Sequence, residues 1–319
     1  MRKALSVVLK RLRALPSISY VLLAVVLLFS LLSRDFYTWT NVVNIIRQGT
    51  VLVIVSMGMM IVIVCAGIDL SVGAMLGLAG TVIAVLLQQG FSLAAAVPLS
   101  LLACCFCGLV AGVIVAKGRI FPFIVTFGML FMVRSVSLGI TKGGSVHIPN
   151  TSFIVFGNAM YLGVPAAFWI TLFLVVLISV VMRRTPFGTH AYAIGINAEN
   201  ARALGIRVDV SVIAAYIASA FLAAVAGIIL ASRVATGNAL VGMGTEFEAV
   251  AAVVVGGTPI TGGRGSLAGT VMGAIFITLL RNGMNLMGLP SQVVAVVIGV
   301  SIMAAVVGAQ LLYRGAVLE

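Results

Sequence analysis

The sequence predicts an all-α polytopic membrane protein, from its composition, its charge distribution and the length of its apolar runs. Hydrophobic residues make up 62% of the chain and charged residues only 8%, against roughly 25% in ordinary soluble domains. The mean hydropathy of +1.27 leaves too little polar surface to face water. Apolar runs of about 20 residues match the length of membrane-crossing helices. We expect a single transmembrane domain over residues 1–319, without a sizeable soluble domain.

The apolar runs predict about ten membrane segments. The first run follows a basic stretch, but no small-residue cleavage pattern comes after it, so we expect an uncleaved first helix. The eighth run is too short for a straight crossing, which predicts that some segments are broken or re-entrant. In order, the runs cover approximately residues 17–33, 50–66, 70–88, 92–116, 120–141, 166–182, 210–231, 245–257, 267–280 and 291–312.

The net charge of +12 indicates membrane orientation rather than nucleic-acid binding, because basic residues lie at the ends of apolar runs and form no aromatic-interleaved patch. With a cytoplasmic N-terminus, the inner set is Arg2, Lys3, Lys10, Arg11, Arg13, Lys117, Arg119, Arg183, Arg184, Arg202, Arg207, Arg264 and Arg314. The outer set is Arg34, Lys142, Arg233 and Arg281. This excess predicts that both termini face the cytoplasm and that residues 142–165 form the main outer loop.

One polar stretch interrupts the apolar sequence at residues 185–207, TPFGTHAYAIGINAENARALGIR. Asn197 is a suitable N-cap, Glu199 falls in a first helical turn, and Gly205 suits a left-handed C-cap. These residues predict a short capped helix on the cytoplasmic side. A helix of about seven residues is unstable alone in water, so it must pack against its own bundle or against a partner. The residues themselves leave open whether the stretch is a structural loop or a docking element.

The same stretch, within a loop expected at about residues 183–209, resembles the cytoplasmic coupling loop of monosaccharide permeases, of the ribose, xylose and allose type, from ATP-binding-cassette importers. The resemblance rests on the run from Arg184 to Ile206, on AGIDLSVGAMLGLAG at 66–80, and on GMGTEFEAVAAVVVGGTPITGGRGSLAGTVMGA at 242–274. These motifs keep the order and spacing of the family over roughly residues 40–310. The last motif has Thr-Pro-Ile at 258–260 where the family more often has Thr-Ser-Leu. We expect this departure to bend the non-helical stretch around residues 258–260 and to leave the fold unchanged.

The resemblance implies that the capped helix docks into a groove on a separate cytoplasmic ATPase subunit. It further implies a second permease chain, identical or paralogous, a periplasmic or lipid-anchored sugar-binding protein, and a location in the bacterial inner membrane. A bulky charged residue at Gly195 or Ala201 is expected to abolish association with the ATPase while leaving membrane insertion intact. The expected coupling residues are Thr185, Phe187, Gly188, Ala193, Gly195, Asn197, Ala201 and Gly205.

Candidates for the translocation pathway or its hinges lie at breaks in the apolar runs: Asp69, Ser71, Gly73, Glu246, Gly256, Gly257 and Asn282. Asp69 either faces the pathway or, together with Ser71, caps the following helix. Glu246 and Glu248 either line an outer mouth or favour a helix N-terminus. Glu246 also occupies the recurring acidic position of the family, which favours a role in transport.

Two further kinds of polar residue near segment ends have simple structural interpretations. Asn282, followed by Gly283, has the pattern of a helix C-cap. Arg134 and Arg281 are expected to extend their charged ends toward the membrane surface. The cysteines lie inside apolar runs without metal-ligand spacing, so we expect them to be packing residues.

The glycines between 256 and 269 do not form a phosphate-binding loop, because the Gly-x-x-x-x-Gly-Lys-Ser/Thr pattern is absent. We therefore expect no cofactor and no ATP binding by this chain. An enzyme is disfavoured because the only histidines, His147 and His190, lie in polar loops and form no zinc motif. The alternative is an ion-coupled secondary transporter of a small polar solute, which Asp69 permits but which leaves the capped helix unexplained. The sequence does not choose among sugars.

Overall fold

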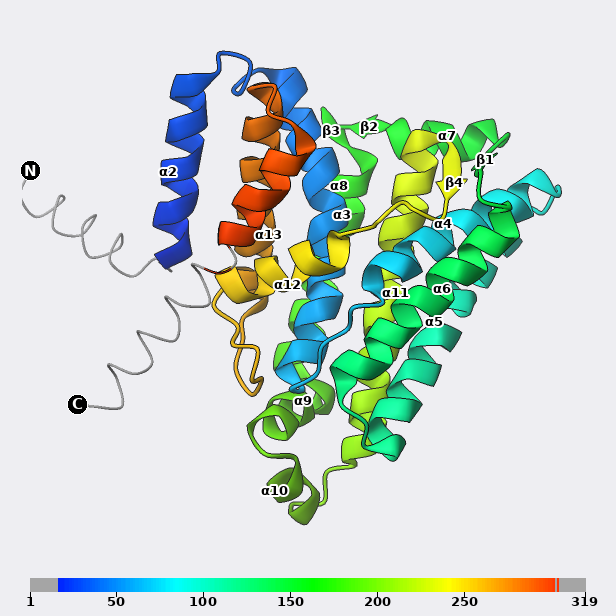
Figure 1. Ribbon diagram of the computed structural model, residues 1–319, viewed down its shortest axis with the longest axis vertical. Coiled ribbons are helices and arrows are strands. Elements are labelled where there is room, and N and C mark those ends of the chain that lie inside the picture. Colours follow the sequence, from blue (N-terminus) through cyan, green and yellow to red (C-terminus); the bar gives the residue numbers. More distant parts are fainter. Residues whose placement is uncertain (1–16, 302, 304–319) are drawn as a thin grey trace, which may run out of the picture.

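The computed structural model describes residues 17–301 and residue 303, and most of that part of the chain is helical (Figure 1). The helices are α2 (Ser17–Leu32), α3 (Trp39–Val64), α4 (Val72–Gln88), α5 (Leu93–Gly118), α6 (Pro122–Thr141), α7 (Thr151–Asn158), α8 (Ala166–Arg184), α9 (Pro186–Ile196), α10 (Ala198–Ala203), α11 (Val208–Val234), α12 (Thr245–Val255) and α13 (Leu267–Leu286). A further helix covers Ser291–Ser301. The short strands are β1 (Ser145–His147), β2 (Met160–Tyr161), β3 (Val164–Pro165) and β4 (Thr236–Asn238).

A helix lies in every predicted apolar run, but not every helix is long enough for a straight crossing. By length and composition, six described helices can span a membrane, namely α3, α5, α6, α8, α11 and α13. The helices Ile18–Leu32, Val72–Gln88 and Ser291–Ser301 are apolar but shorter, and α12 has only 11 residues. The end of the tenth run and the two chain termini lie outside the described residues. The protein is therefore a multi-pass helical membrane protein with several short or broken segments.

The second predicted run begins too late, since α3 starts at Trp39 and not near residue 50. Thr38 caps this helix, its hydroxyl accepting a hydrogen bond from the backbone N–H of Asn41 at 3.4 Å. The polar side chains of Asn41, Arg47 and Gln48 hide the first turns from a search for apolar residues. Asn41 pairs with Asn282 of α13, and Gln48 lines a pocket between helices.

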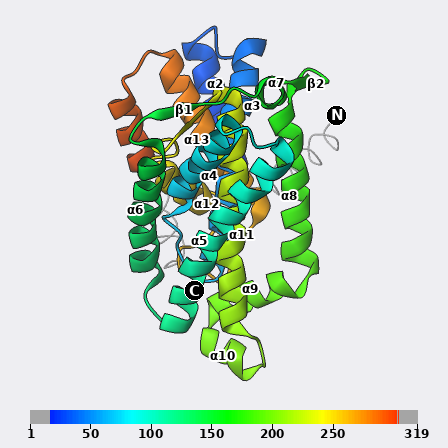
Figure 2. The same ribbon diagram turned by 90° about the vertical axis from the view of Figure 1, so that its right-hand side faces the viewer.

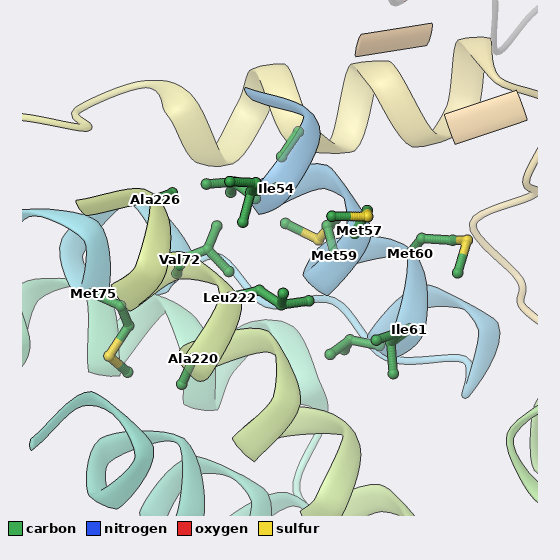
Figure 3. Packing of buried hydrophobic residues seen from close by; sticks show 14 of the residues in the cluster. Ile54, Met57, Met59, Met60, Ile61, Val72, Met75, Ala220, Leu222 and Ala226 are labelled. Carbon is green, nitrogen blue, oxygen red and sulfur yellow. The ribbon is translucent and has the colours of Figure 1, made fainter. Parts of the chain in front are cut away.

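The helices α3 and α11 run through the centre of the bundle, and α5, α6 and α8 lie at its periphery (Figures 1 and 2). The core is rich in methionine and branched aliphatic residues. Figure 3 shows Met57, Met59 and Met60 of α3, Met75 of α4 and Leu222 of α11 among them, with Met60 and Met75 on opposite sides of the view. Large apolar side chains on the peripheral helices remain exposed, which suits contact with lipid.

Close packing of α5 on α11 depends on glycine. A Cβ atom added to Gly112 of α5 would lie 2.9 Å from the Cα atom of Ile213 in α11, and one at Gly108 would lie 2.8 Å from the Tyr216 carbonyl oxygen. Two glycines four residues apart occupy one face of a helix, and in membranes such a face lets two backbones approach closely. The contact fixes α5 against the central helix.

Two non-helical breaks interrupt the bundle. The first, residues 65–71, joins α3 to α4 and holds Ala66 in the left-handed region with φ 59°. The second, residues 256–266, joins α12 to α13 and is called the glycine loop below. In Figure 1, α12 lies across the middle of the bundle and the glycine loop extends from it toward α10. Irregular backbone at membrane depth is tolerated where it is buried in protein or lines a cavity.

The two ends of the bundle differ in structure. The end that carries α9 and α10 is called the α10 end, and the opposite end, with β1 to β4 and α7, is called the strand end (Figure 1). The predicted outer loop, residues 142–165, contains β1, α7, β2 and β3. It is anchored to the last turn of α11, because β1 pairs antiparallel with β4 and the Ser232 hydroxyl donates a hydrogen bond to the Phe153 carbonyl oxygen at 2.5 Å.

Candidate functional site

The polar stretch 185–207 forms the helices α9 and α10 beyond the end of the bundle (Figures 1 and 2). The predicted caps are confirmed: the Asn197 side chain accepts a hydrogen bond from the backbone N–H of Asn200 at 2.8 Å, and Gly205 has φ +83°. The six-residue α10 is held by tertiary packing, since the buried Ala201 contacts Ile194 and Val208.

The predicted coupling residues fall into three groups by their exposure. Asn197 and Gly205 are exposed, whereas Gly188 and Ala201 are buried against the protein, and Thr185, Phe187, Ala193 and Gly195 are half-buried. The exposed apolar side chains on this segment are Ile196, 74% exposed, and Leu204, 81% exposed. The expected test at Gly195 and Ala201 therefore does not isolate docking, because bulk at either position first disturbs internal packing.

The segment α9 touches both breaks of the bundle at once. A Cβ atom on Gly195 would overlap the Val64 carbonyl oxygen at the end of α3 and the backbone of Gly263 in the glycine loop. Gly263 itself donates its backbone N–H to that same carbonyl of Val64 at 3.0 Å. The Tyr192 hydroxyl of α9 donates to the Gly265 carbonyl oxygen at 3.1 Å. The segment 185–207 thus meets the end of α3 and the glycine loop together, and Ala66, the first residue of the motif at 66–80, lies against Gly262 of that loop.

The hydroxyl of Tyr192 keeps its proton at neutral pH. Partial burial raises the pKa of Tyr192 above its usual value, while the nearby Arg183 acts in the opposite direction. Because an unperturbed tyrosine already has a pKa of about 10, the phenol remains a hydrogen-bond donor to the glycine loop.

Asp69 is buried in the first break. Its carboxylate accepts hydrogen bonds from the backbone N–H of Ser71 at 3.0 Å, from the Ser71 hydroxyl at 2.5 Å, and from the Ser219 hydroxyl of α11 at 2.8 Å. Ser71 is the N-cap residue of α4 but makes no side-chain cap bond. Asp69 therefore ties the break to α11, in addition to bonding the start of α4.

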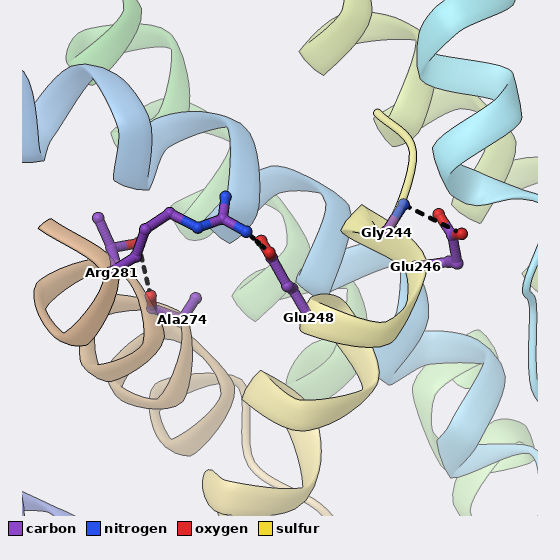
Figure 4. Close-up of polar contacts among 6 residues, drawn as sticks. Gly244, Glu246, Glu248, Ala274 and Arg281 are labelled. Atoms are coloured by element: carbon purple, nitrogen blue, oxygen red, sulfur yellow. Dashed lines mark hydrogen bonds and ion pairs between the residues drawn. The ribbon is translucent and has the colours of Figure 1, made fainter. Parts of the chain in front are cut away.

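Glu246 of α12 lies against α4, and Arg134 of α6 bonds the segment between β4 and α12. One carboxylate oxygen of Glu246 accepts the Gly244 backbone N–H at 3.2 Å, and the carboxylate lies directly over Gly73 in the first turn of α4 (Figure 4). The expectation that Arg134 extends to the membrane surface is wrong. Its buried guanidinium donates to the carbonyl oxygens of Ala239 at 2.8 Å and Val241 at 3.3 Å.

Glu248 and Arg281 form an ion pair between α12 and α13 (Figure 4). The Arg281 side chain remains 41% exposed, so its extension toward the membrane surface stays a prediction. Glu246 and Glu248 do begin α12, as predicted, but they point to different sides of it. No local pattern pairs Arg281 with Glu248, which lies 33 positions earlier in another segment.

Asn282 is not a helix C-cap, because α13 continues to Leu286. Its side chain instead pairs with that of Asn41 in α3, and the next residue, Gly283, packs against the ring of Phe29. Gly256 lies where the backbones of α12 and α13 meet, since a Cβ atom there would overlap Gly269. Gly257, the second residue of the glycine loop, has φ +89°.

An open pocket of about 270 Å³ lies between α3, α11, α12 and α13. Its polar lining comes from Gln48, Arg233, Thr245, Glu248, Thr278 and Arg281. None of the sequence-predicted pathway candidates lines this pocket. Glu248, two residues after the candidate Glu246, does line it. In the described part of the chain, no group of three or more His, Cys, Asp or Glu residues is arranged to hold a metal ion.

A multi-helix membrane bundle with two broken segments, an internal polar network and a capped projection has the architecture of a transport subunit. Residues 41–306 match the family described as branched-chain amino acid transport system / permease component, and the chain belongs to this family of permeases. The chain is 38% identical to the ribose import permease protein of Escherichia coli (strain K12) over 89% of this chain and 90% of that protein.

Two other relatives are similar over comparable lengths. The ribose import permease protein of Bacillus subtilis (strain 168) is 35% identical over 89% of both chains. The autoinducer 2 import system permease protein of Photorhabdus laumondii is 31% identical over 85% of this chain and 82% of that protein. No solved structure matches.

Proposed function

We propose that this chain is the membrane subunit of an ATP-binding-cassette importer for a monosaccharide or a similar small polyhydroxylated solute. The family supports the role of a permease, and the ribose import permeases support the solute class. Residues 1–319 form one permease domain with about ten segments in a bacterial inner membrane. ATP is hydrolysed by a separate partner, so this subunit itself carries no catalytic site.

The α10 end faces the cytoplasm in this proposal, and the strand end faces outward. Lys117, Arg119, Arg183 and Arg184 lie at helix ends beside α9 and α10, while the strand end has fewer basic residues. Cytoplasmic loops carry an excess of Lys and Arg, which supports this orientation, and the proposal has both termini inside. A sugar-binding protein would then deliver solute at the strand end.

The observation that carries the proposal is the contact of α9 with both breaks. Docking of an ATPase on the exposed part of α9 and α10 would move Gly195, and with it the end of α3 and the glycine loop. The first break joins α3 to α4 and the second joins α12 to α13, and α3, α12 and α13 line the polar pocket. Nucleotide-driven closure of two ATPase subunits on two permease chains would thereby switch the pathway between outward-open and inward-open arrangements.

The test is uptake of labelled D-ribose, D-xylose and D-allose by cells that express this chain with its ATPase and its binding protein. Uptake that requires all three proteins and stops on ATP depletion is the expected result. Uptake by this chain alone, stopped by an uncoupler and not by ATP depletion, would establish ion coupling instead and overturn the proposal.

A further inference from the structure

The polar pocket between α3, α11, α12 and α13 lies in the half of the bundle near the strand end. Gln48 is in the early turns of α3, Arg233 is in the last turn of α11, and Arg281 is near the end of α13. In a chain with only 8% charged residues, charged and amide side chains are concentrated here from four separate helices. Polar side chains within membrane segments are costly, which makes such a cluster a functional-site hypothesis by default.

Two polar side chains of the lining have hydrogen-bonding capacity that the protein does not use. The Gln48 amide and the Thr245 hydroxyl line the pocket, and neither has a hydrogen-bond partner within the described part of the chain. By contrast, the Thr278 hydroxyl donates to the Ala274 carbonyl oxygen of its own helix at 2.7 Å. Gln48 and Thr245 are therefore free to bond a solute.

The charged residues of the pocket are already fixed in place. Glu248 and Arg281 hold each other across the gap between α12 and α13, as Figure 4 shows, and Arg233 donates to the Arg47 carbonyl oxygen at 3.0 Å. A guanidinium has five N–H donors and a carboxylate has several acceptor sites, so each group retains capacity for a further bond. The Glu248–Arg281 pair also borders a second pocket of about 410 Å³, lined by Asn285 and Ser291 among others.

The chemistry of the lining favours a neutral polyol over an ion or an apolar side chain. Amide, hydroxyl, carboxylate and guanidinium groups together offer both donors and acceptors, and each sugar hydroxyl acts as both. A lining of cations alone would select an anion, and an apolar lining would select a hydrophobic solute. The volume of about 270 Å³ falls just below the roughly 300–1,000 Å³ of pockets for drug-sized ligands, as suits a single sugar ring.

From these observations we infer that this pocket is a sugar-binding site within the permease, in which Gln48 and Thr245 bond solute hydroxyls and help to set specificity. The inference rests on the proposed function and adds to it a selection step inside the membrane subunit. The selection is separate from that of the sugar-binding protein. Asp69 and Glu246 are not part of the site, because they are buried on other sides of the bundle.

The test compares Gln48→Ala and Thr245→Val with the wild-type chain, assembled with the ATPase in proteoliposomes and supplied with the binding protein. Uptake of labelled D-ribose and 2-deoxy-D-ribose is measured together with ATP hydrolysis and with thermal stability of the assembly. Gln88→Ala, at an exposed position near the end of α4, is the matched control. D-xylose and D-allose replace D-ribose if one of them is the transported sugar.

The expected result is a roughly three- to tenfold fall in sugar carried per ATP for each variant, the size expected for loss of one hydrogen bond. ATP hydrolysis, its stimulation by the binding protein and thermal stability stay at wild-type values, and the preference between the two sugars changes. Unchanged transport and preference in both variants would overturn the inference, as would a fall that only follows lost stability. If the wild-type chain transports none of the tested sugars, the proposed function itself is contradicted, and the inference about the pocket falls with it.

Discussion

Asn41 of α3 and Asn282 of α13 exchange two hydrogen bonds within the bundle. The Asn41 amide nitrogen donates to the Asn282 oxygen at 3.0 Å, and the Asn282 amide nitrogen donates to the Asn41 oxygen at 2.8 Å. Both side chains are buried. The pair fastens the first turn of α3 to the last turns of α13, beside the ring of Phe29 that packs on Gly283. It thereby sets the spacing of two helices that line the polar pocket.

The asparagine pair predicts a stability difference between single and double replacement. Asn282→Ala leaves the Asn41 amide buried without its partner, and we expect a loss of about 1–2 kcal/mol, since unsatisfied buried groups cost roughly 1–3 kcal/mol and single interhelical bonds in membranes average about 0.6 kcal/mol. The double variant Asn41→Leu with Asn282→Leu should recover most of this loss. Thermal unfolding in detergent measures both. A double variant less stable than the single one would contradict the assigned pair.

The contact of α5 with α11 predicts that added bulk is harmful only on one glycine face. Gly112→Leu should lower the free energy of unfolding by about 1–3 kcal/mol, because overpacking forces the helices apart. Gly128→Leu on α6 is the control, since a Cβ atom at Gly128 meets nothing within 4 Å. Unfolding of both variants in the same detergent gives the comparison, and equal losses would count against the packing described.

The exposed apolar side chains of the capped segment predict where an ATPase binds. Leu204→Glu and Ile196→Glu should weaken association at least tenfold with no loss of bundle stability, because fully burying one such side chain contributes roughly 1.5–3 kcal/mol. Co-purification and titration with the purified ATPase measure the change. Leu162→Glu at the strand end, also exposed, is the control and should bind the ATPase normally. Normal ATPase binding by the Leu204→Glu variant would show that the interface lies on other residues.

The inward-facing glycine of α9 predicts a different defect. Gly195→Leu should leave the exposed face of the segment available to the ATPase but displace α9 from Val64 and Gly263. Sugar carried per ATP should then fall while ATP hydrolysis continues. Ala203→Leu, on an exposed position of α10, supplies the added bulk without the contact. Loss of ATPase binding by Gly195→Leu alone would restore the simpler docking interpretation of this residue.

The buried carboxylate in the first break predicts that geometry matters more than charge. Asp69→Asn keeps one oxygen that accepts from Ser71, and its amide NH2 can donate to the Ser219 hydroxyl oxygen, so we expect a stable protein with substantial transport. Asp69→Ala leaves those donors without acceptors in a buried site and should reduce the yield of folded protein. Uptake and size-exclusion profiles of the two variants test this. Complete loss of transport in a well-folded Asp69→Asn variant would indicate that the charge itself takes part.

Sequence reasoning located helices and caps better than it located contacts. The apolar runs identify where helices lie, because burial in lipid requires about 20 apolar residues, and Asn197 and Gly205 mark α10 because capping is local. The partners Asn41 and Asn282 are 241 residues apart, and no local pattern pairs them. Likewise, the short α9 gave no periodicity from which to tell that Gly195 faces the bundle. Polar residues inside apolar runs were the available signal for these contacts.

The pairing of β1 with β4 has a consequence for how force crosses the molecule. It fastens residues 145–147 to the chain that leaves α11, and the opposite end of α11 begins at Val208, packed on Ala201 of α10. A helix of 27 residues is about 40 Å long and nearly incompressible along its axis. A displacement of α10 therefore shifts or tilts α11 as a rigid rod. The paired strands β1 and β4 at the strand end then move with it, without any change of structure within α11.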